Sequence, residues 1–317
     1  MLDHLHIQNY RLFKDLKIDK LGRVNLIAGK NNTGKTALLE AMRIWASKAH
    51  ASVLANVIKA RDEYDDNNWF SYTNLFTNRN YSDIFINNLS IKIQNIKEKY
   101  TDLYDSFTDL KLVIKYEGEE IREISSLVNG LNPIDELIYL PIWKTNDLDK
   151  KLYKNISFEE QDDVVEILQI ILPNIKRFRI DDNGAKVLTS GGEELKLSRL
   201  GDGVNRLLTI ALSIINAKNK ILLIDEFEVG LHHSVQEQLW EIIFKYAKEW
   251  NIQVFVTTHS QDTVKAFAEV WNKSEENIKM GNYFRLQRSR ENLELIEPVY
   301  YDNEMLEFAY QKHIETR

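Results

Sequence analysis

Residues 29–36, GKNNTGKT, constrain the fold most strongly, because they fit G-x-x-x-x-G-K-[ST] between the apolar run VNLIAG and a helical pattern. Glycine is scarce in the whole chain: 12 of 317 residues, about half of its average 7% usage. A tight turn without side chains at Gly29 and Gly34 lets backbone N–H groups converge on a phosphate. Lys35 would then reach the terminal phosphates, and the Thr36 hydroxyl would bind Mg²⁺. This segment predicts a phosphate-binding loop.

Composition excludes several classes of protein. The chain has no cysteine, which rules out a disulfide scaffold, a thiolate zinc site and a cysteine nucleophile. Its net charge of −7 argues against a surface that coats nucleic acid indiscriminately, although a local basic face can coexist with it. No run of 18 uncharged apolar residues occurs, and the N-terminus lacks the apolar core of a signal peptide. We therefore expect a cytoplasmic protein with no membrane contact.

The periodicity of apolar residues predicts an α/β core preceded by β-rich segments. Alternation predicts strands at 2–10 and 12–18, a buried strand at 24–29, and a helix over 35–60. In the middle of the chain, alternation predicts strands at 89–96 and 110–116 that form a small antiparallel sheet. A helix is expected next, at 156–174, with Ser157 as its cap. A meander then follows at 176–197, with turns at Asn183-Gly184 and Gly191-Gly192. Helices and strands then alternate, as parallel α/β units do: helix 204–217, strand 221–225, helix 234–248, strand 252–258, helix 262–271, a hairpin over 282–301 and a short helix over 303–313.

Two carboxylates end the predicted strand in ILLIDE at 221–226. Strand alternation points Asp225 and Glu226 in different directions, so Asp225 can hold a metal while Glu226 acts as the general base toward water. A strand that simply ends in solvent is the alternative. His259 ends the next predicted strand, at the sheet edge where the phosphate loop also lies, and can reach a terminal phosphate or the catalytic water. A capped strand end is its alternative, and the spacing of His232 and His233 does not suit zinc.

The segments IQNYRLFKDLKI…VNLIAGKNNTGKT, LSRLGDG, ILLIDEFEVGLHHS and FVTTHS resemble the ATPase heads of the ABC superfamily, in its RecF, SMC and overcoming-lysogenization-defect branch. The resemblance implies an α/β P-loop NTPase with an antiparallel β N-terminal part and no long coiled coil. It would be a single domain over 1–317, with residues 51–160 as an inserted mixed lobe. In this family two heads sandwich two ATP molecules with Mg²⁺, so it implies an ATPase that forms a homodimer or a higher even-numbered oligomer.

The family's signature loop, which faces the partner's nucleotide, has two candidates here. Residues 190–193, SGGE, match the consensus but precede a strand-like segment. Residues 198–203, SRLGDG, run directly into a helical pattern, as an anion-binding helix N-terminus requires. We favour the second segment and interpret the first as a hairpin turn. The resemblance then implies that the nucleotide of the partner head is contacted by four residues: Ser198, Gly201, Asp202 and Gly203.

Further residues take roles only through the resemblance. Asn31, Asn32 and Thr33 complete the phosphate loop, and His259 matches the family's switch histidine. Arg11 and Phe13 lie where related heads meet the adenine base. The segment that crosses to the partner head matches Glu228, Gly230, Leu231 and His232. The glutamine loop has no clear counterpart, and the aromatic segment around Trp69 is expected to pack the second lobe.

The spacing of the motifs narrows the kind of ATPase. About 160 residues separate Thr36 from Ser198, too few for long coiled-coil arms, because a 20-residue helix spans only about 30 Å. The 57 residues after Ser260 are too few for a fused nuclease domain. The resemblance therefore favours stand-alone ATPases of bacterial antiphage systems such as Septu and PARIS, in which a separately encoded effector, a nuclease or toxin, is gated.

Three other functions stay open. They are a RecF-type repair ATPase, the ATP-binding subunit of a transporter, and a scaffold that binds ATP without hydrolysing it. Contact with DNA or RNA also stays open, since residues 176–179 and 285–290 are basic.

Overall fold

The computed structural model describes residues 1–61, 63, 75–76, 83–95, 110–124, 137–142, 148–181 and 184–311. Its strands are β1 (Leu5–Tyr10), β2 (Phe13–Ile18), β3 (Val24–Ala28), β4 (Ile84–Ile86), β5 (Leu89–Asn95), β6 (Leu110–Tyr116), β7 (Glu119–Ile124), β8 (Leu137–Leu140), β9 (Ile175–Asp181), β10 (Gly184–Thr189), β11 (Glu194–Lys196), β12 (Ile221–Ile224), β13 (Gln253–Thr258), β14 (Gly281–Arg288) and β15 (Ile296–Tyr301). Its α-helices are α1 (Lys35–Ala46), α2 (Ala51–Lys59), α3 (Leu148–Lys154), α4 (Glu160–Leu168), α5 (Asp202–Asn216), α6 (Gln236–Glu249), α7 (Gln261–Trp271), α8 (Glu275–Met280) and α9 (Asn303–Gln311), with 3₁₀ turns η4 (Leu197–Arg199) and η5 (His233–Val235).

The central layer is a six-stranded sheet in the order β15-β14-β3-β13-β12-β8. All neighbours in it are parallel except β15, which pairs antiparallel with β14. Strands β3 and β13 are buried along their whole length, as parallel strands covered on both faces must be. The α/β core with parallel strands predicted for the last third is confirmed.

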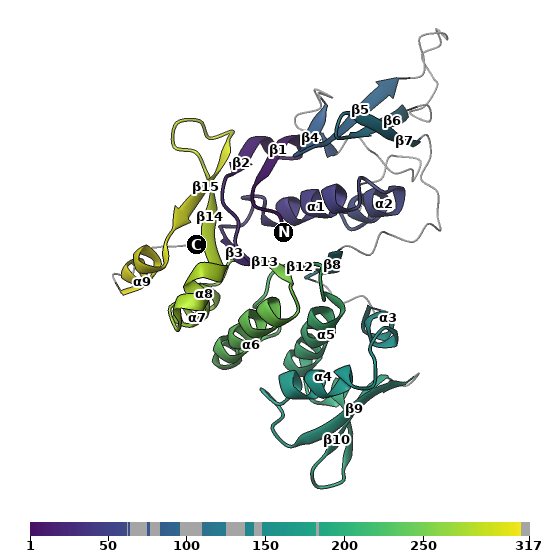
Figure 1. Ribbon diagram of the computed structural model, residues 1–317, viewed down its shortest axis with the longest axis vertical. Helices are drawn as coiled ribbons and strands as arrows, with labels where there is room; N and C mark the ends of the chain where they lie inside the picture. Colours follow the sequence, from purple (N-terminus) through teal and green to yellow (C-terminus); the bar gives the residue numbers. More distant parts are fainter. Residues whose placement is uncertain are drawn as a thin grey trace.

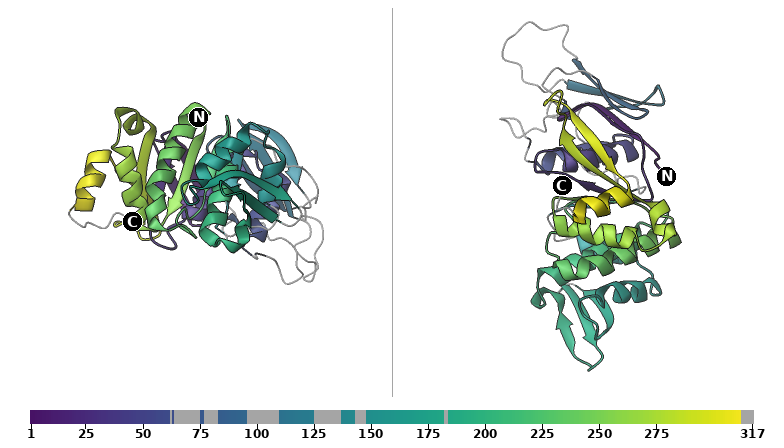
Figure 2. Two further views of the ribbon diagram at one scale, coloured as in Figure 1. Left: turned by 90° about the horizontal axis from the view of Figure 1, so that it is seen from below. Right: turned by 90° about the vertical axis from the view of Figure 1, so that its left-hand side faces the viewer.

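Two apolar cores lie on the two faces of this sheet. Leu26 of β3 packs into the core with α5, α6 and α7, whereas the next residue, Ile27, packs into the core with α1 and the N-terminal strands. Figure 1 shows α1 and α2 between the central sheet and a second sheet, and α5 to α7 on the opposite side. Figure 2 shows the same layers stacked along the long axis of the molecule. The second sheet is antiparallel, in the order β2-β1-β4-β5-β6-β7.

The helix expected over 35–60 is divided in two. Lys48 and Ala49 both adopt left-handed backbone conformations, with φ of 49° and 50°, and separate α1 from α2. The new helix is capped by His50, whose imidazole Nδ1 accepts a hydrogen bond from the Ser52 amide. Both helices keep their apolar faces buried, so the break redirects the chain without changing which residues pack in the core.

Residues 51–160, expected as one inserted lobe, contribute to three parts of the molecule. Strands β4 to β7 extend the N-terminal sheet through the pairing of Ile7 with Ile86, and so join β1 and β2 rather than forming a small separate sheet. Strand β8, which we did not predict, is the edge of the central sheet and pairs with β12. Helix α3 packs against α5. Trp69 lies outside the described residues.

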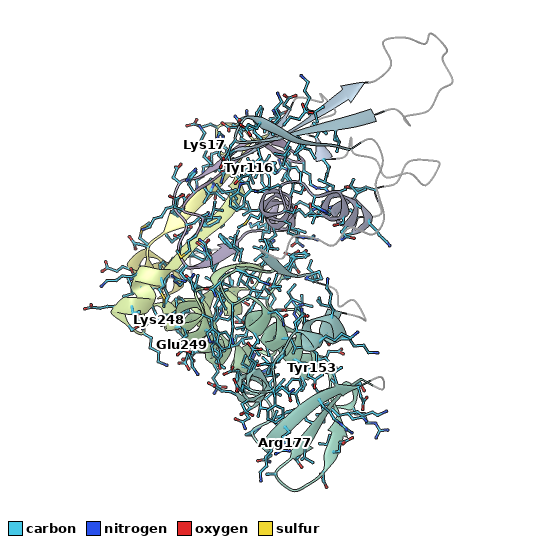
Figure 3. All side chains as sticks on the ribbon, turned by 45° about the vertical axis from the view of Figure 1, so that its right-hand side comes forward. Lys17, Tyr116, Tyr153, Arg177, Lys248 and Glu249 are labelled. Atoms are coloured by element: carbon cyan, nitrogen blue, oxygen red, sulfur yellow. The ribbon has the colours of Figure 1, made fainter. Side chains whose placement is uncertain are left out.

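The meander predicted at 176–197 is confirmed as a three-stranded antiparallel sheet in the order β11-β10-β9. Asn183, expected in its first turn, lies outside the described residues. Tyr153 of α3 packs edge-on against Phe178 of β9, with ring centroids 5.5 Å apart, which attaches the meander to the helical layer. Figure 3 labels Tyr153 on the helical side and Arg177 on the meander. Ser157 and Glu160 form a reciprocal capping box, so the predicted cap on α4 is correct.

Candidate functional site

The phosphate loop lies between β3 and α1, at the carboxyl edge of the central sheet. Gly34 adopts φ of 93°, a left-handed conformation in which L side chains are strained. A Cβ at Gly34 would also lie 2.6 Å from the ring of Phe13. Only glycine therefore fits this position, which turns the chain into α1 and leaves the first amides of the helix open to a phosphate.

Lys35 follows directly and is buried. Its ammonium donates hydrogen bonds to the Gly29 carbonyl at 2.8 Å and to the Lys30 carbonyl at 3.2 Å, so the side chain curls back over the loop. Burial lowers the pKa of Lys35. The carboxylates at residues 225, 226 and 228 act in the opposite direction. A bound phosphate chain would favour the charged ammonium further, as a phosphate-binding lysine requires.

A cavity of about 580 Å³ opens over this loop. The predicted site residues that line it are Asn31, Asn32, Gly34, Lys35, Thr36, Glu226 and His259. The cavity is also lined by four residues that we did not predict as site residues: Leu12, Ala37, Arg61 and Arg288. The loop, the base expected after β12 and the histidine expected after β13 thus meet in one place, because parallel strands bring their carboxyl ends to the same edge.

The two carboxylates that follow β12 occupy different environments, as expected, although Glu226 is directed by a left-handed backbone rather than by strand alternation. Asp225 is fully buried, and its Oδ1 accepts a hydrogen bond from the Thr257 hydroxyl at 2.5 Å. The Thr257 hydroxyl also accepts a hydrogen bond from the Glu226 amide at 2.9 Å. Glu226 adopts φ of 46°, a left-handed conformation that costs roughly 1–2 kcal/mol, and its side chain lines the cavity.

The residues proposed for Mg²⁺ offer only oxygen donors, which suit a hard cation. Asp225 Oδ2 is buried and has no hydrogen-bond partner among the described residues, so it is available to a cation or its water. Thr36 lines the cavity at the start of α1. The described part of the chain holds no cluster of three or more His, Asp or Glu that could bind a metal by itself. The donor set therefore fits an ion that takes its remaining ligands from phosphate and water.

His259 lies between two carboxylates. Its Nδ1 is 3.0 Å from Glu228 Oε1 and 3.4 Å from Glu226 Oε2. Glu228 also accepts hydrogen bonds from the His259 amide and from the Thr258 hydroxyl, both at 2.8 Å. Glu228, which the resemblance placed in the segment that crosses to the partner, thus orients His259 toward Glu226 within the same chain. His232 bonds Ser234 and does not line the cavity.

The two signature candidates differ in structure. Residues 190–192 form the turn between β10 and β11, as expected for a hairpin. Residues 198–203 pass through η4 into the N-terminus of α5, where Ser198, Gly201 and Asp202 are exposed. None of the second set lines the cavity over the phosphate loop of its own chain. A Cβ at Gly203 would lie 2.9 Å from the Gly230 carbonyl, so this loop packs tightly on the segment after the carboxylates.

Comparisons with known proteins agree with this architecture. Residues 1–140 match a family model described as "AAA ATPase domain", and residues 131–264 match one described as "AAA domain, putative AbiEii toxin, Type IV TA system". An "ATP/GTP phosphatase" of Helicobacter pylori is 22% identical over an alignment of 378 positions, which covers 98% of this chain and 98% of that one. The RecF protein of Lactobacillus acidophilus is 54% identical over 45 residues, 14% of this chain and 12% of that one.

Solved structures share the fold. The SMC head domain of Thermotoga maritima superimposes with a TM-score of 0.52 at 12% identity, over 95% of this chain and 98% of that one. The Smc head domain of Pyrococcus furiosus, solved with the C-terminal domain of ScpA, has the same TM-score at 10% identity over 99% of both chains. The fold is that of an ABC-type ATPase head. The two family matches support an ATPase at a general level.

Arg206 connects helix α5 to the backbone that follows β12. Its Nη2 donates hydrogen bonds to the carbonyls of Asp225 at 3.0 Å and Glu226 at 3.4 Å, and its Nη1 donates one to Pro141 at 2.9 Å. These bonds, with the Thr257 hydroxyl on the Glu226 amide, hold the left-handed backbone at Glu226. Sequence patterns could not find this role, because an arginine inside an amphipathic helix has no local signal.

The expected adenine contacts of the head are not available. Arg11 is 7% exposed and forms ion pairs with Glu40 at 2.8 Å and Glu63 at 2.7 Å. Phe13 is fully buried against Gly34, where it shapes the phosphate loop. Neither residue lines the cavity, so we correct both assignments to structural roles behind the loop.

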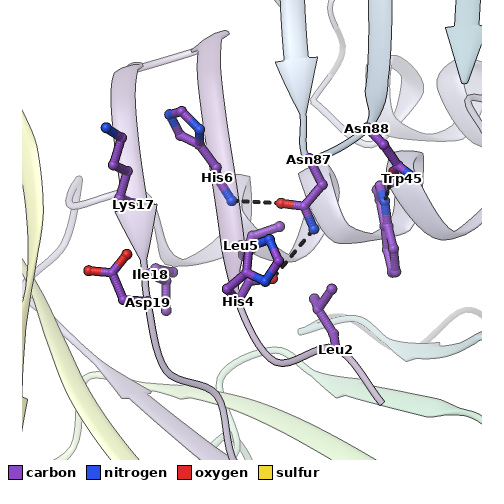
Figure 4. Close-up of a pocket in the computed structure, with 10 residues that line it drawn as sticks. All are labelled: Leu2, His4, Leu5, His6, Lys17, Ile18, Asp19, Trp45, Asn87 and Asn88. Carbon is purple, nitrogen blue, oxygen red and sulfur yellow. Dashed lines mark hydrogen bonds between the residues drawn. The ribbon is translucent and has the colours of Figure 1, made fainter. Parts of the chain in front are cut away.

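A second cavity of the head lies between β1, β2, the end of α1 and the β4–β5 turn (Figure 4). Several of its polar side chains already have partners: Asn87 accepts a hydrogen bond from the His6 amide at 2.8 Å, and Trp45 donates one to Asn88 at 3.0 Å. None of the predicted site residues lines it. No helix in the described parts of the head is long and apolar enough to span a membrane.

Proposed function

We propose that this chain is an ATP-hydrolysing head that dimerises around ATP and Mg²⁺ and gates a separately encoded effector. One observation carries the proposal: Lys35, Glu226 and His259 meet at one cavity, whereas the expected signature residues Ser198, Gly201 and Asp202 lie outside it and are exposed. A single chain thus holds half of a composite site. The Helicobacter pylori protein described as an ATP/GTP phosphatase matches this chain along nearly its full length, which supports nucleotide hydrolysis.

In the proposed reaction Glu226 takes a proton from the attacking water. His259 lies within 3.4 Å of its Oε2, so both side chains reach the same point near the terminal phosphate. Lys35 and the amides at the start of α1 bind the phosphates and stabilise the charge that develops on them. Thr36 and Asp225 would hold Mg²⁺, which when bound neutralises phosphate charge. The exposed N-terminus of α5 would meet the terminal phosphate of the partner's nucleotide.

The effector is the finer part of the proposal. The family model over residues 131–264 carries a toxin–antitoxin description, which supports a role in antiphage defence with a nuclease or toxin as the effector. A second candidate, a DNA-repair ATPase of the RecF type, is favoured by the 45-residue match at 54% identity to that protein. In either case hydrolysis would reopen the dimer and release or rearrange what is bound to it.

A mixing experiment tests the composite site. We expect Lys35→Ala and Gly203→Asp each to abolish ATP hydrolysis when assayed alone. Mixed together, they should recover activity, because a mixed dimer joins the intact phosphate loop of the Gly203→Asp chain to the intact signature loop of the Lys35→Ala chain in one of its two sites. Phosphate release at a range of mixing ratios measures this recovery. Two separately inactive variants that stay inactive when mixed, under conditions where they form dimers, would contradict a site shared between chains.

The proposed effector can be sought directly. Native mass spectrometry of the protein purified from its natural host, with and without ATP, should detect a second polypeptide whose occupancy changes with nucleotide. A nuclease or toxin would support the defence role, and a DNA-repair protein would favour the RecF-type alternative. Homodimers with no other chain under either condition would argue against gating of a bound effector.

A further inference from the structure

Arg288 lines the nucleotide cavity, although the sequence placed it in a basic segment considered for nucleic acid. We propose that Arg288 binds the nucleoside end of the nucleotide and so contributes to selection of the substrate. The proposal rests on the proposed function, because it takes the cavity to hold a nucleoside triphosphate. It adds a contact on the C-terminal hairpin, β14–β15, to a site otherwise built from the phosphate loop, β12 and β13.

The order of the strands sets the direction of the nucleotide. Glu226 follows β12 and His259 follows β13, while β14 lies on the other side of β3. Ala28 pairs with both Thr258 and Arg285, so the three neighbouring strands reach the cavity at the same level. A triphosphate whose terminal phosphate lies near Glu226 and His259 must therefore extend over the phosphate loop toward β14. Arg288, the last residue of β14, is at that far end.

The backbone of β14 directly borders the phosphate loop. A Cβ at Gly29 would lie 2.8 Å from the Leu286 carbonyl, two residues before Arg288. The hairpin loop is also attached to β2, because Lys14 forms an ion pair with Glu294. Leu12, at the β1–β2 turn near this attachment, lines the same cavity. An apolar side chain and a guanidinium thus border the part of the cavity away from the catalytic carboxylate.

Arg288 is prepared to bind a ligand. Its Nη1 donates a hydrogen bond to the Leu293 carbonyl at 2.7 Å, which fixes the guanidinium and leaves its other N–H groups available. No ion pair is formed by Arg288 among the described residues. Arg61, the other arginine of the cavity, differs in that its Nε is 2.8 Å from Glu40 Oε1. The cation with spare donors is therefore Arg288.

The chemistry of a guanidinium fits a nucleoside. Its planar group stacks on aromatic bases and donates hydrogen bonds to ring nitrogens, carbonyls and ribose hydroxyls. Lysine would keep the charge but lose the plane and the fork of donors. The expected ligand group is therefore the base and ribose of a purine nucleoside triphosphate, with the phosphates bound independently by Lys35 and the loop.

Calorimetric titration of the full chain separates the two ends of the nucleotide. The probes are the non-hydrolysable analogue adenylyl imidodiphosphate, ADP and inorganic tripolyphosphate, each with Mg²⁺. Arg288→Ala should weaken binding of both nucleotides by a similar factor, about 10-fold, and leave tripolyphosphate binding unchanged. Arg288→Lys should recover only part of the loss. Arg290→Ala, at an exposed arginine of the same hairpin that does not line the cavity, should bind all three probes as the wild type does.

The outcomes distinguish this proposal from the one on which it rests. Equal losses for tripolyphosphate and nucleotide would overturn the assignment to the nucleoside end and indicate a phosphate contact. Unchanged binding of every probe by Arg288→Ala would remove the residue from the site. A wild-type chain that binds no probe would instead refute the proposed function. Arg288 is exposed, so its replacement should leave the melting temperature unchanged and any loss should reflect binding.

Discussion

Replacing Glu226 with Gln should stop ATP turnover and trap an ATP-dependent dimer. Gln has the shape of Glu and keeps the backbone amide that donates to the Thr257 hydroxyl, so the left-handed conformation at residue 226 should persist. It lacks the carboxylate that accepts a proton from water, a contribution of typically 10²–10⁴-fold in rate. We expect phosphate release to fall by at least about 100-fold. Light scattering with ATP and Mg²⁺ should report twice the monomer mass.

The matched control for this variant is Glu237→Gln. Glu237 is an exposed carboxylate in the first turn of α6 and does not line the cavity. Its replacement makes the same change of charge, so it should leave both turnover and assembly at wild-type values. Hydrolysis by Glu226→Gln at the wild-type rate would show that another group activates the water. Loss of turnover without a trapped dimer would separate the base from the proposed assembly.

Gly203→Asp should abolish hydrolysis, whereas Gly191→Ala should not. A Cβ at Gly203 would lie 2.9 Å from the Gly230 carbonyl, and an aspartate there would add negative charge beside the proposed phosphate contact at the start of α5. A Cβ at Gly191 would come no closer than 3.8 Å to the Thr189 hydroxyl, in an exposed turn. The variants thus test which of two glycine-containing loops serves as the signature.

Phosphate release and ATP-dependent dimer formation are the two measurements for this pair. Gly203→Asp should bind ATP with near wild-type affinity, because its own phosphate loop is intact, yet fail to form a homodimer, because both sites of that homodimer would lack an intact signature loop. The thermal unfolding midpoints of both variants establish that they are folded. Active Gly203→Asp together with inactive Gly191→Ala would reverse the assignment and return the signature to residues 190–193.

Much of the fold follows from local patterns. Strands β12 and β13 are apolar runs between helices with clear periodicity, so both their existence and their order could be predicted. Strand β8 could not, because its pairing with β12 joins residues that are 84 positions apart in the sequence, and no local pattern records that pairing. The break between α1 and α2 was also missed, since residues 48 and 49 are otherwise compatible with a helix.

Some residues of the candidate site could likewise be predicted from the sequence, and others could not. The phosphate loop could be predicted because its spacing encodes the turn itself, and the cavity indeed includes Lys35 and Thr36. Arg11 was expected at the adenine of the nucleotide, because the sequence carries no record of its ion pairs with Glu40 and Glu63. Arg288 was found only in the folded chain, because it reaches the loop through a parallel pairing with β3.

By itself, the sequence determined the phosphate loop, the carboxylate pair and the alternation of strands and helices, because backbone turns and apolar periodicity are properties of neighbouring residues. Only the tertiary structure decided which side chains face the cavity. Arg206 bonds a backbone carbonyl that is distant in the sequence, and Arg288 lines a cavity whose other residues are distant from it. Arg11 and Phe13 do not line that cavity. Such choices depend on strand order and on the burial of charges, which no local pattern encodes.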